Sequence, residues 1–183
     1  SAAGGLDTIP FYGNNGQVPP DIEYISHWNF SRSVETGRTA LTSYDFTRPS
    51  TSLAADRNFA RAHGEASHEQ FDYQGDYTQR GEGAHLADVR LDEQQTRHES
   101  LSGATNAHAL AVGHRFKLSR HPREDQNTDY VCVSTQINAH INSLESGSGS
   151  SAGDVQCSFT ALPASQQFRP QRATPKPFVQ GPQ

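Results

Sequence analysis

The chain has 183 residues, 33% of them hydrophobic, a formal net charge of −5 and no methionine. This length suits one large domain or two small ones, and the mean hydropathy of −0.76 is low for a globular protein. The charges are mixed and form no basic stripe, which argues against a nucleic-acid partner, and no run of about 18 apolar residues is present to span a membrane. We expect small cores, long loops and burial against partner copies.

Turn-forming residues dominate positions 1–21, so we expect a loop or linker there. Four apolar residues then recur with a period of two, which predicts a strand with an aromatic face. They are Ile22, Tyr24, Trp28 and Phe30. A turn around Gly37 and a return strand over 38–46 complete an expected antiparallel hairpin. Residues 48–64 are polar and predict a long loop or an irregular edge.

The composition of residues 82–101 predicts the one helix, of about five turns, because no proline or glycine follows Gly83 there and good helix formers are frequent. Leu86 and Val89 form a narrow apolar stripe, whereas the second half is polar almost all round. We therefore expect this half to be solvated or covered by a partner. Gly103 is a plausible stop after the helix.

The remaining elements are predicted as short β-strands. They are residues 68–73, 115–119, 130–141 and 154–162, the last two as antiparallel neighbours around a Gly/Ser-rich tip. Beyond residue 163 prolines punctuate the chain. The fold class predicted is mainly β, antiparallel and barrel-like, with one helix and long loops. We expect one β domain over 22–165 and a proline-stiffened neck over 166–183, and we expect both ends of the chain to be cut.

Two cysteines are too few for a disulfide scaffold or a cysteine zinc site. Strand alternation places Cys132 opposite the face of Val131, Val133 and Ile137, and places Cys157 on the apolar face of its own strand. The thiols are then expected on opposite sides of the sheet, so that a disulfide requires a bulge or another pairing.

Nine histidines invite a metal hypothesis. The densest set is His63, His68 and Glu69, with Asp72 nearby. Zinc needs its ligands in fixed geometry on one face, and neither a helical nor a strand period aligns the two histidines. A solvated polar surface is the simpler interpretation. We predict no metal site and no cofactor, and the other histidines are expected to be surface or hydrogen-bonded residues.

Carboxylates on the predicted helix offer a second candidate site. They are Asp88, Asp92, Glu93 and Glu99. Paired carboxylates can perform acid–base catalysis, but ion pairs such as Glu93 with Arg97 explain this pattern on a solvated helix. No nucleophile elbow, phosphate-binding loop or dinucleotide fingerprint is present. We predict no catalytic residues.

Aromatic residues of the expected hairpin form a third candidate. They are Tyr24, Trp28, Phe30, Tyr44 and Phe46. Such a set can bind carbohydrate, but on a hairpin with period two it is more often the core face.

Several short motifs follow one another along the chain. They are Ser26-x-Trp28-x-Phe30-Ser31-Arg32, Tyr44-Asp45-Phe46-x-Arg48-Pro49-Ser50, Phe71-Asp72-Tyr73-x-Gly75-Asp76-Tyr77, Gly113-x-Arg115-Phe116 with His121-Pro122, and the proline-rich end from Thr174 to Gln183. Taken in this order, they resemble the VgrG spike proteins of type VI secretion. Each motif is weak, but the ordered set is fairly specific and covers the chain from about Tyr24 onward.

This resemblance implies a hub similar to that of contractile phage baseplates, with β-barrel-like tube domains and no catalytic residues. It implies a homotrimer that couples an Hcp-type tube to a membrane-puncturing needle, with effector or tip proteins as further partners. The needle, not this region, would contact a membrane. Localisation would be the bacterial cytoplasm before firing, followed by secretion or delivery into a target cell. A β-rich carbohydrate- or protein-binding module, and less readily a metal-dependent hydrolase, remain the alternatives.

Overall fold

The computed structural model describes residues 8–13, 18–19, 21–59, 61–62, 64–65, 67–73, 75–140, 154–175 and 181. The chain forms two compact units, in place of the single domain expected over 22–165. Unit 1 comprises Ser1–Ser33 with Glu99–Gln167, and unit 2 comprises Val34–His98 with Phe168–Gln183. Each unit is therefore built from two segments that are distant in sequence.

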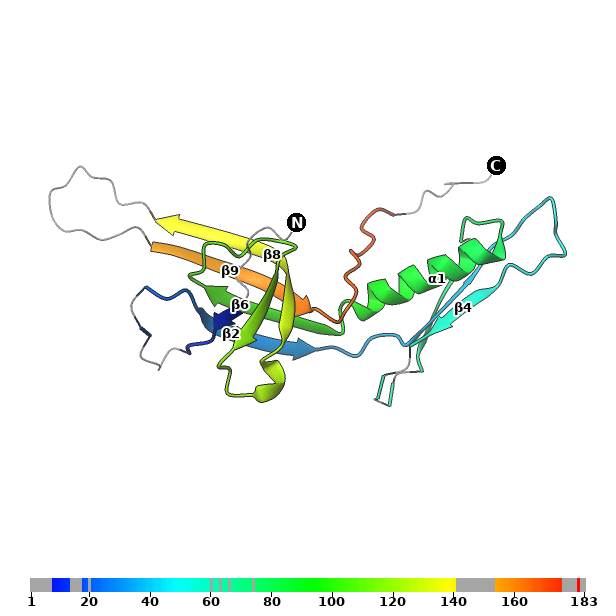
Figure 1. Ribbon diagram of the computed structural model, residues 1–183. Helices are drawn as coiled ribbons and strands as arrows, with labels where there is room; N and C mark the ends of the chain where they lie inside the picture. Colours follow the sequence, from blue (N-terminus) through cyan, green and yellow to red (C-terminus); the bar gives the residue numbers. More distant parts are fainter. Residues whose placement is uncertain are drawn as a thin grey trace. The chain divides into compact units, whose positions relative to one another are not determined.

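Unit 1 contains a six-stranded sheet with the order β1-β7-β8-β9-β6-β2 (Figure 1). Its strands are β1 (Thr8–Pro10), β2 (Ile25–Arg32), β6 (Glu99–Thr105), β7 (Arg115–Ser119), β8 (Asp129–His140) and β9 (Asp154–Pro163), and a short 3-10 helix, η1, spans Glu124–Gln126. All pairs are antiparallel except β1 with β7. Residues 8–10, expected in a loop, thus form an edge strand, because Ile9 is fully buried in the core.

Aromatic rings fill the core of unit 1. Trp28 lies 4.9 Å from Tyr130 and 6.1 Å from Phe159 between ring centroids, and Phe116 meets Phe159 edge to face at 5.8 Å. Gly103 lets the ring of Phe159 cross β6, since a Cβ there would lie 2.6 Å from Cζ of that ring. Trp28 and Phe30 are partly buried and pack against this core, as predicted for them, which argues against a sugar platform on these two rings.

Two β-bulges reset the alternation of side chains in unit 1. In β2 the register shifts at Ser26, so that Ile25, not Tyr24, enters the core. In β8 the register shifts at Val133. The extra residue of a bulge sends the following side chains to the opposite face. Predictions that assumed an unbroken period of two are therefore wrong around both positions.

Unit 2 has a three-stranded sheet with the order β4-β3-β5, packed on one helix. Its elements are β3 (Arg38–Thr42), β4 (Ala55–Asn58), β5 (Glu69–Tyr73) and α1 (Arg80–Gln95). β3 pairs antiparallel with β4 and parallel with β5. Leu41, Leu53, Tyr77 and Ala87 form the small core between sheet and helix.

Tyr77 is enclosed by two glycines of unit 2. A Cβ at Gly75 or at Gly83 would overlap the Tyr77 ring, so both positions require the absence of a side chain. The Tyr77 hydroxyl donates a 2.6 Å hydrogen bond to the carbonyl of Leu53. The ring therefore fastens the loop before β4 to the start of α1.

The predicted hairpin of 22–32 with 38–46 is wrong, because β2 pairs with β6 in unit 1 whereas β3 pairs with β4 and β5 in unit 2. The predicted helix also ends too late. α1 stops at Gln95, where the Thr96 hydroxyl bonds back to the carbonyl of Asp92, and Glu99–Thr105 form β6 with alternate burial. Gly103 thus lies within a strand and is no helix stop.

The predictions of a mainly β, barrel-like fold with one helix are confirmed, as are the strands at 68–73 and 115–119 and the antiparallel pairing of 130–141 with 154–162. The Gly/Ser-rich tip between the last two lies outside the described residues. Within the described part of the chain, no helix is long and apolar enough to cross a membrane.

Candidate assembly site

The polar half of α1 is covered by the segment that follows unit 1 in sequence. We call residues 168–175 the strap; they belong to unit 2 together with α1. Glu93, near the end of α1, is 6% exposed although it is charged. Its Oε1 accepts a 2.9 Å hydrogen bond from the backbone N–H of Arg172. A buried carboxylate requires such partners, so the strap accounts for the burial of Glu93.

Arginine side chains surround the same carboxylate. Arg90 Nη1 lies 3.2 Å from Glu93 Oε2, and Arg172 Nε lies 3.7 Å from that oxygen. Arg172 also reaches Asp72 of β5 at 3.6 Å. The strap thus joins the helix to the edge strand of the sheet through one arginine.

A second arginine fixes the beginning of the strap. The Arg169 backbone N–H donates to Thr96 Oγ1 at 3.1 Å, and its Nε lies 3.6 Å from Asp92 Oδ2. An open polar groove of about 450 Å³ remains beside the strap, lined by residues of β5, α1 and the strap itself. The second half of α1 was expected to be solvated or covered by a partner, but at Glu93 the strap of the same chain covers it.

The carboxylates predicted as candidate acid–base residues all meet arginines. Asp88 pairs with Arg57 at 2.6 Å, Asp92 with Arg169, Glu93 with Arg90, and Glu99 with Arg32 at 2.9 Å. The expected pair of Glu93 with Arg97 is replaced by an Arg97–Glu35 contact at 3.8 Å. Ion pairing within the fold therefore explains these residues, and Glu99 lies on β6 rather than on the helix.

The structure separates the other predicted candidates. His68 pairs with Glu65 at 2.8 Å, and among the described residues no three His, Cys, Asp or Glu side chains converge on a possible metal position. His63 lies outside the described residues. Tyr44 and Phe46 are 59% and 83% exposed, so they are not part of a common core face with Trp28.

The two cysteines lie on the same face of the sheet, contrary to the prediction. Cys132 pairs with Ala161 and Cys157 with Ile137, with the bulge at Val133 between the two pairs. Both thiols are free and buried. Burial raises the pKa of Cys132 to about 11 and also raises that of Cys157, so neither is an activated nucleophile.

Comparison with known proteins shows which family the chain belongs to and which proteins it resembles. Residues 1–143 match the model of the phage tail baseplate hub (GPD) family. The chain belongs to the VgrG branch of that family.

Two spike proteins of Pseudomonas aeruginosa are similar to the chain. It is 34% identical to type VI secretion system spike protein VgrG1b over its whole length and to spike protein VgrG1c over 98% of it, covering 25% and 24% of those proteins. Actin cross-linking toxin VgrG1 of Vibrio cholerae is 27% identical over 88% of the chain and is covered to 15%. The chain thus spans about a quarter of the length of the curated spike proteins it matches.

The motifs that carry the VgrG resemblance have structural roles in both units. Trp28 packs against the core of unit 1, and Gly75 and Tyr77 form the close contact described above. Asp45 and Arg48 form an ion pair at 3.0 Å in the turn after β3. The strap arginines were not recognised from the sequence. The sequence signal that could have found them is charge complementarity: Arg169 and Arg172 are positive, and Asp92 and Glu93 on α1 are negative.

Proposed function

We propose that this chain is a structural part of a type VI secretion spike, a baseplate hub segment that assembles as a homotrimer and couples an Hcp-type tube to a membrane-puncturing needle. Membership of the VgrG family supports the spike role. The strap is the structural feature that carries the proposal, because a hub must pass axial load to whatever follows it. Its role is mechanical and requires no catalytic residue.

The ion pairs of the strap fit this load-bearing role. Arg169 and Arg172 lie on either side of Pro170, which fixes the backbone between them. Each arginine contacts an acidic side chain of α1, and Arg172 also contacts β5. A pull on the C-terminal side of the strap is therefore distributed over the helix and the sheet of unit 2. Residues 168–175 of the neck expected over 166–183 thus contact the helix and the edge strand of unit 2.

Partners and location follow from the same proposal. Three copies would form a ring through heterologous, closing contacts, with the tube protein on one side and effector or tip proteins reached through regions outside this chain. The protein would stay in the bacterial cytoplasm until firing and then be secreted or delivered into a target cell.

A hybrid spike protein tests the proposal. The segment of P. aeruginosa VgrG1b that matches this chain is replaced by the chain, and the hybrid is expressed in a strain that lacks its own copy. We expect a homotrimer by native mass spectrometry and export of both hybrid and tube protein into the medium. A folded hybrid that stays monomeric and is not exported would refute the proposal. Wild-type VgrG1b in the same strain is the positive control.

We expect the isolated 183-residue chain to self-associate weakly, because the other regions of the spike that would share the ring contacts are absent. Light scattering that shows a tight trimer at micromolar concentration would contradict this expectation.

A further inference from the structure

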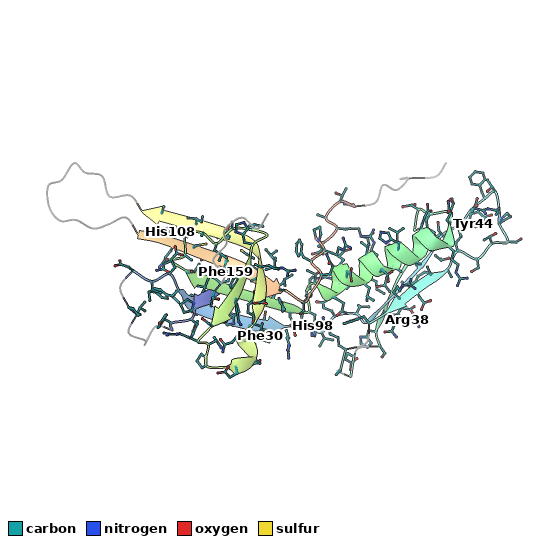
Figure 2. The ribbon with its side chains drawn as sticks, viewed as in Figure 1. Phe30, Arg38, Tyr44, His98, His108 and Phe159 are labelled. Carbon is teal, nitrogen blue, oxygen red and sulfur yellow. The ribbon has the colours of Figure 1, made fainter. Side chains whose placement is uncertain are left out.

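The polar groove beside the strap, which we call the strap groove, is formed by three separate segments of unit 2. β5, the end of α1 and the strap each contribute side chains to it, and its volume is about 450 Å³. Sites for small molecules commonly measure about 300–1,000 Å³. Figure 2 marks the neighbouring end of α1 with His98, whereas Tyr44 lies at the opposite end of the helix. The strap groove therefore belongs to unit 2 alone and is large enough for a ligand.

The charges along the strap groove cancel. Asp72 and Glu93 are negative, and Arg97 and Arg172 are positive. Arg172 contacts both carboxylates, at 3.6 and 3.7 Å, and Arg97 pairs with Glu35 at 3.8 Å. All four charged side chains are thus engaged within the fold. Because the groove presents no net charge to attract an ion, it favours a neutral ligand.

Three glutamines supply further polar groups to the strap groove. Gln70 comes from β5, Gln94 from α1 and Gln171 from the strap. Gln171 is held in place, because the backbone N–H groups of Arg169 and Arg172 on either side of it bond to side chains at the end of α1. A carboxamide both donates and accepts hydrogen bonds, and so does a hydroxyl group. The glutamines therefore match a ligand that is rich in hydroxyl groups.

One aromatic ring borders these amides. Phe71 follows Gln70 on β5, lines the strap groove and is 60% exposed. Its ring offers a flat apolar surface with a negative face, on which the C–H groups of a sugar ring can stack. A purely apolar ligand would displace water from the glutamines without replacing its hydrogen bonds. A saccharide satisfies both kinds of group, since it carries hydroxyl groups around an apolar C–H face.

We propose that the strap groove binds a neutral oligosaccharide. One sugar ring stacks on Phe71, and its hydroxyl groups exchange hydrogen bonds with the three glutamines. The groove is open, so that further sugar units can extend beyond it. This site is distinct from the sugar platform considered for Trp28 and Phe30, which pack against the core of unit 1. The proposal goes beyond the spike role and does not depend on it.

An NMR titration of the complete ¹⁵N-labelled chain tests the site. The probes are maltotetraose, cellotetraose and chitotetraose, three neutral oligosaccharides that differ in linkage and in N-acetylation. We expect at least one probe to bind with a Kd of about 1 mM or less and to shift the side-chain amide signals of Gln70, Gln94 and Gln171. If none of the three probes shifts these signals at about 10 mM, the proposal is overturned.

Two variants and one matched control locate the binding. Phe71→Ala and Gln171→Ala should each raise the Kd about tenfold, because each removes one of the two kinds of contact. Phe46→Ala should leave the Kd unchanged, since Phe46 is a second exposed phenylalanine of unit 2, 83% exposed in the turn after β3. An equal loss in all three variants would overturn the proposal, as would an unchanged Kd in both Phe71→Ala and Gln171→Ala.

Inorganic phosphate distinguishes a saccharide site from an anion site. We expect phosphate at the same concentration to leave the signals of the strap groove in place, because Arg97 and Arg172 are already paired. If phosphate shifts the guanidinium signals of these arginines and competes with the bound probe, the groove is an anion site and the proposal is wrong. The backbone spectrum of each variant checks its fold, and Gln171→Ala, on the exposed strap, keeps the test decisive if Phe71→Ala does not fold.

Discussion

Replacing Glu93 with alanine tests whether the strap is held by its carboxylate. The side chain is 7% exposed, and it combines the hydrogen bond from the Arg172 N–H with contacts to the guanidinium groups of Arg90 and Arg172. Alanine removes all three at once. The rest of α1 is expected to stay folded, because its apolar contacts through Leu86 and Ala87 are not affected.

The magnitude follows from the geometry of these contacts. A hydrogen bond to a charged acceptor contributes about 1.5–3 kcal/mol, whereas the Arg172 ion pair adds at most about 1 kcal/mol because its side chain is 39% exposed. Water replaces part of the lost bond once the strap opens. We expect the free energy of local strap opening to fall by about 2 kcal/mol, which corresponds to about 30-fold faster amide exchange.

Hydrogen exchange measured by NMR reads this effect directly, because the reporter is the amide that donates the bond. The Arg172 N–H is expected to exchange about 30-fold faster in Glu93→Ala and only a few-fold faster in Glu93→Gln, which keeps an acceptor. The Cys132 N–H, bonded to the His114 carbonyl at 2.9 Å in unit 1, is the internal control. An unchanged Arg172 rate in Glu93→Ala would show that the strap is held elsewhere.

Three further predictions concern packing and protonation. Gly103→Ala should lower the stability of unit 1 by about 1–3 kcal/mol in denaturant unfolding, because the added methyl meets Phe159; an unchanged midpoint would contradict this close packing. Tyr77→Phe should lower the free energy of unfolding by about 1–2 kcal/mol, because it leaves the buried carbonyl of Leu53 without its hydrogen-bond donor. A stability equal to that of the parent chain would argue against this bond. The thiol pKa of Cys132, raised to about 11 by burial, favours the folded state below the unfolded pKa near 9; this contribution should decline as pH rises from 9 to 11, and rapid reaction with a thiol reagent at pH 8 without denaturant would refute it.

Strand positions were largely predictable, but faces and partners were not. The strands at 68–73, 115–119 and 154–162 follow from β-branched and aromatic residues between turn signals. Ser26 and Val133 carry no sequence signal for a bulge, yet each changes which side chains enter the core. The wrong pairing of 22–32 with 38–46 has another cause. Residues that follow one another around a turn were assumed to pair, whereas the chain leaves unit 1 at that point.

The strap shows why the candidate site could not be located from local patterns. The polar half of α1 has the composition of a solvated helix face, and only partners more than 70 residues away make Glu93 a buried residue. The strap itself contains prolines and reads as free coil. Neither segment reveals the contact alone, and the sequence showed only that two arginines of the strap and two adjacent acidic residues of α1 carry opposite charges.

The strap contacts both layers of unit 2, and this has a mechanical consequence. It contacts the C-terminal half of α1 through Asp92 and Glu93, and it contacts the edge strand β5 through Asp72. Because Arg172 takes part in both contacts, a pull on the strap is shared between the helix and the sheet. Complete release of the strap therefore requires ion pairs to both layers to break, and a variant that removes Glu93 alone leaves the contact with β5 in place.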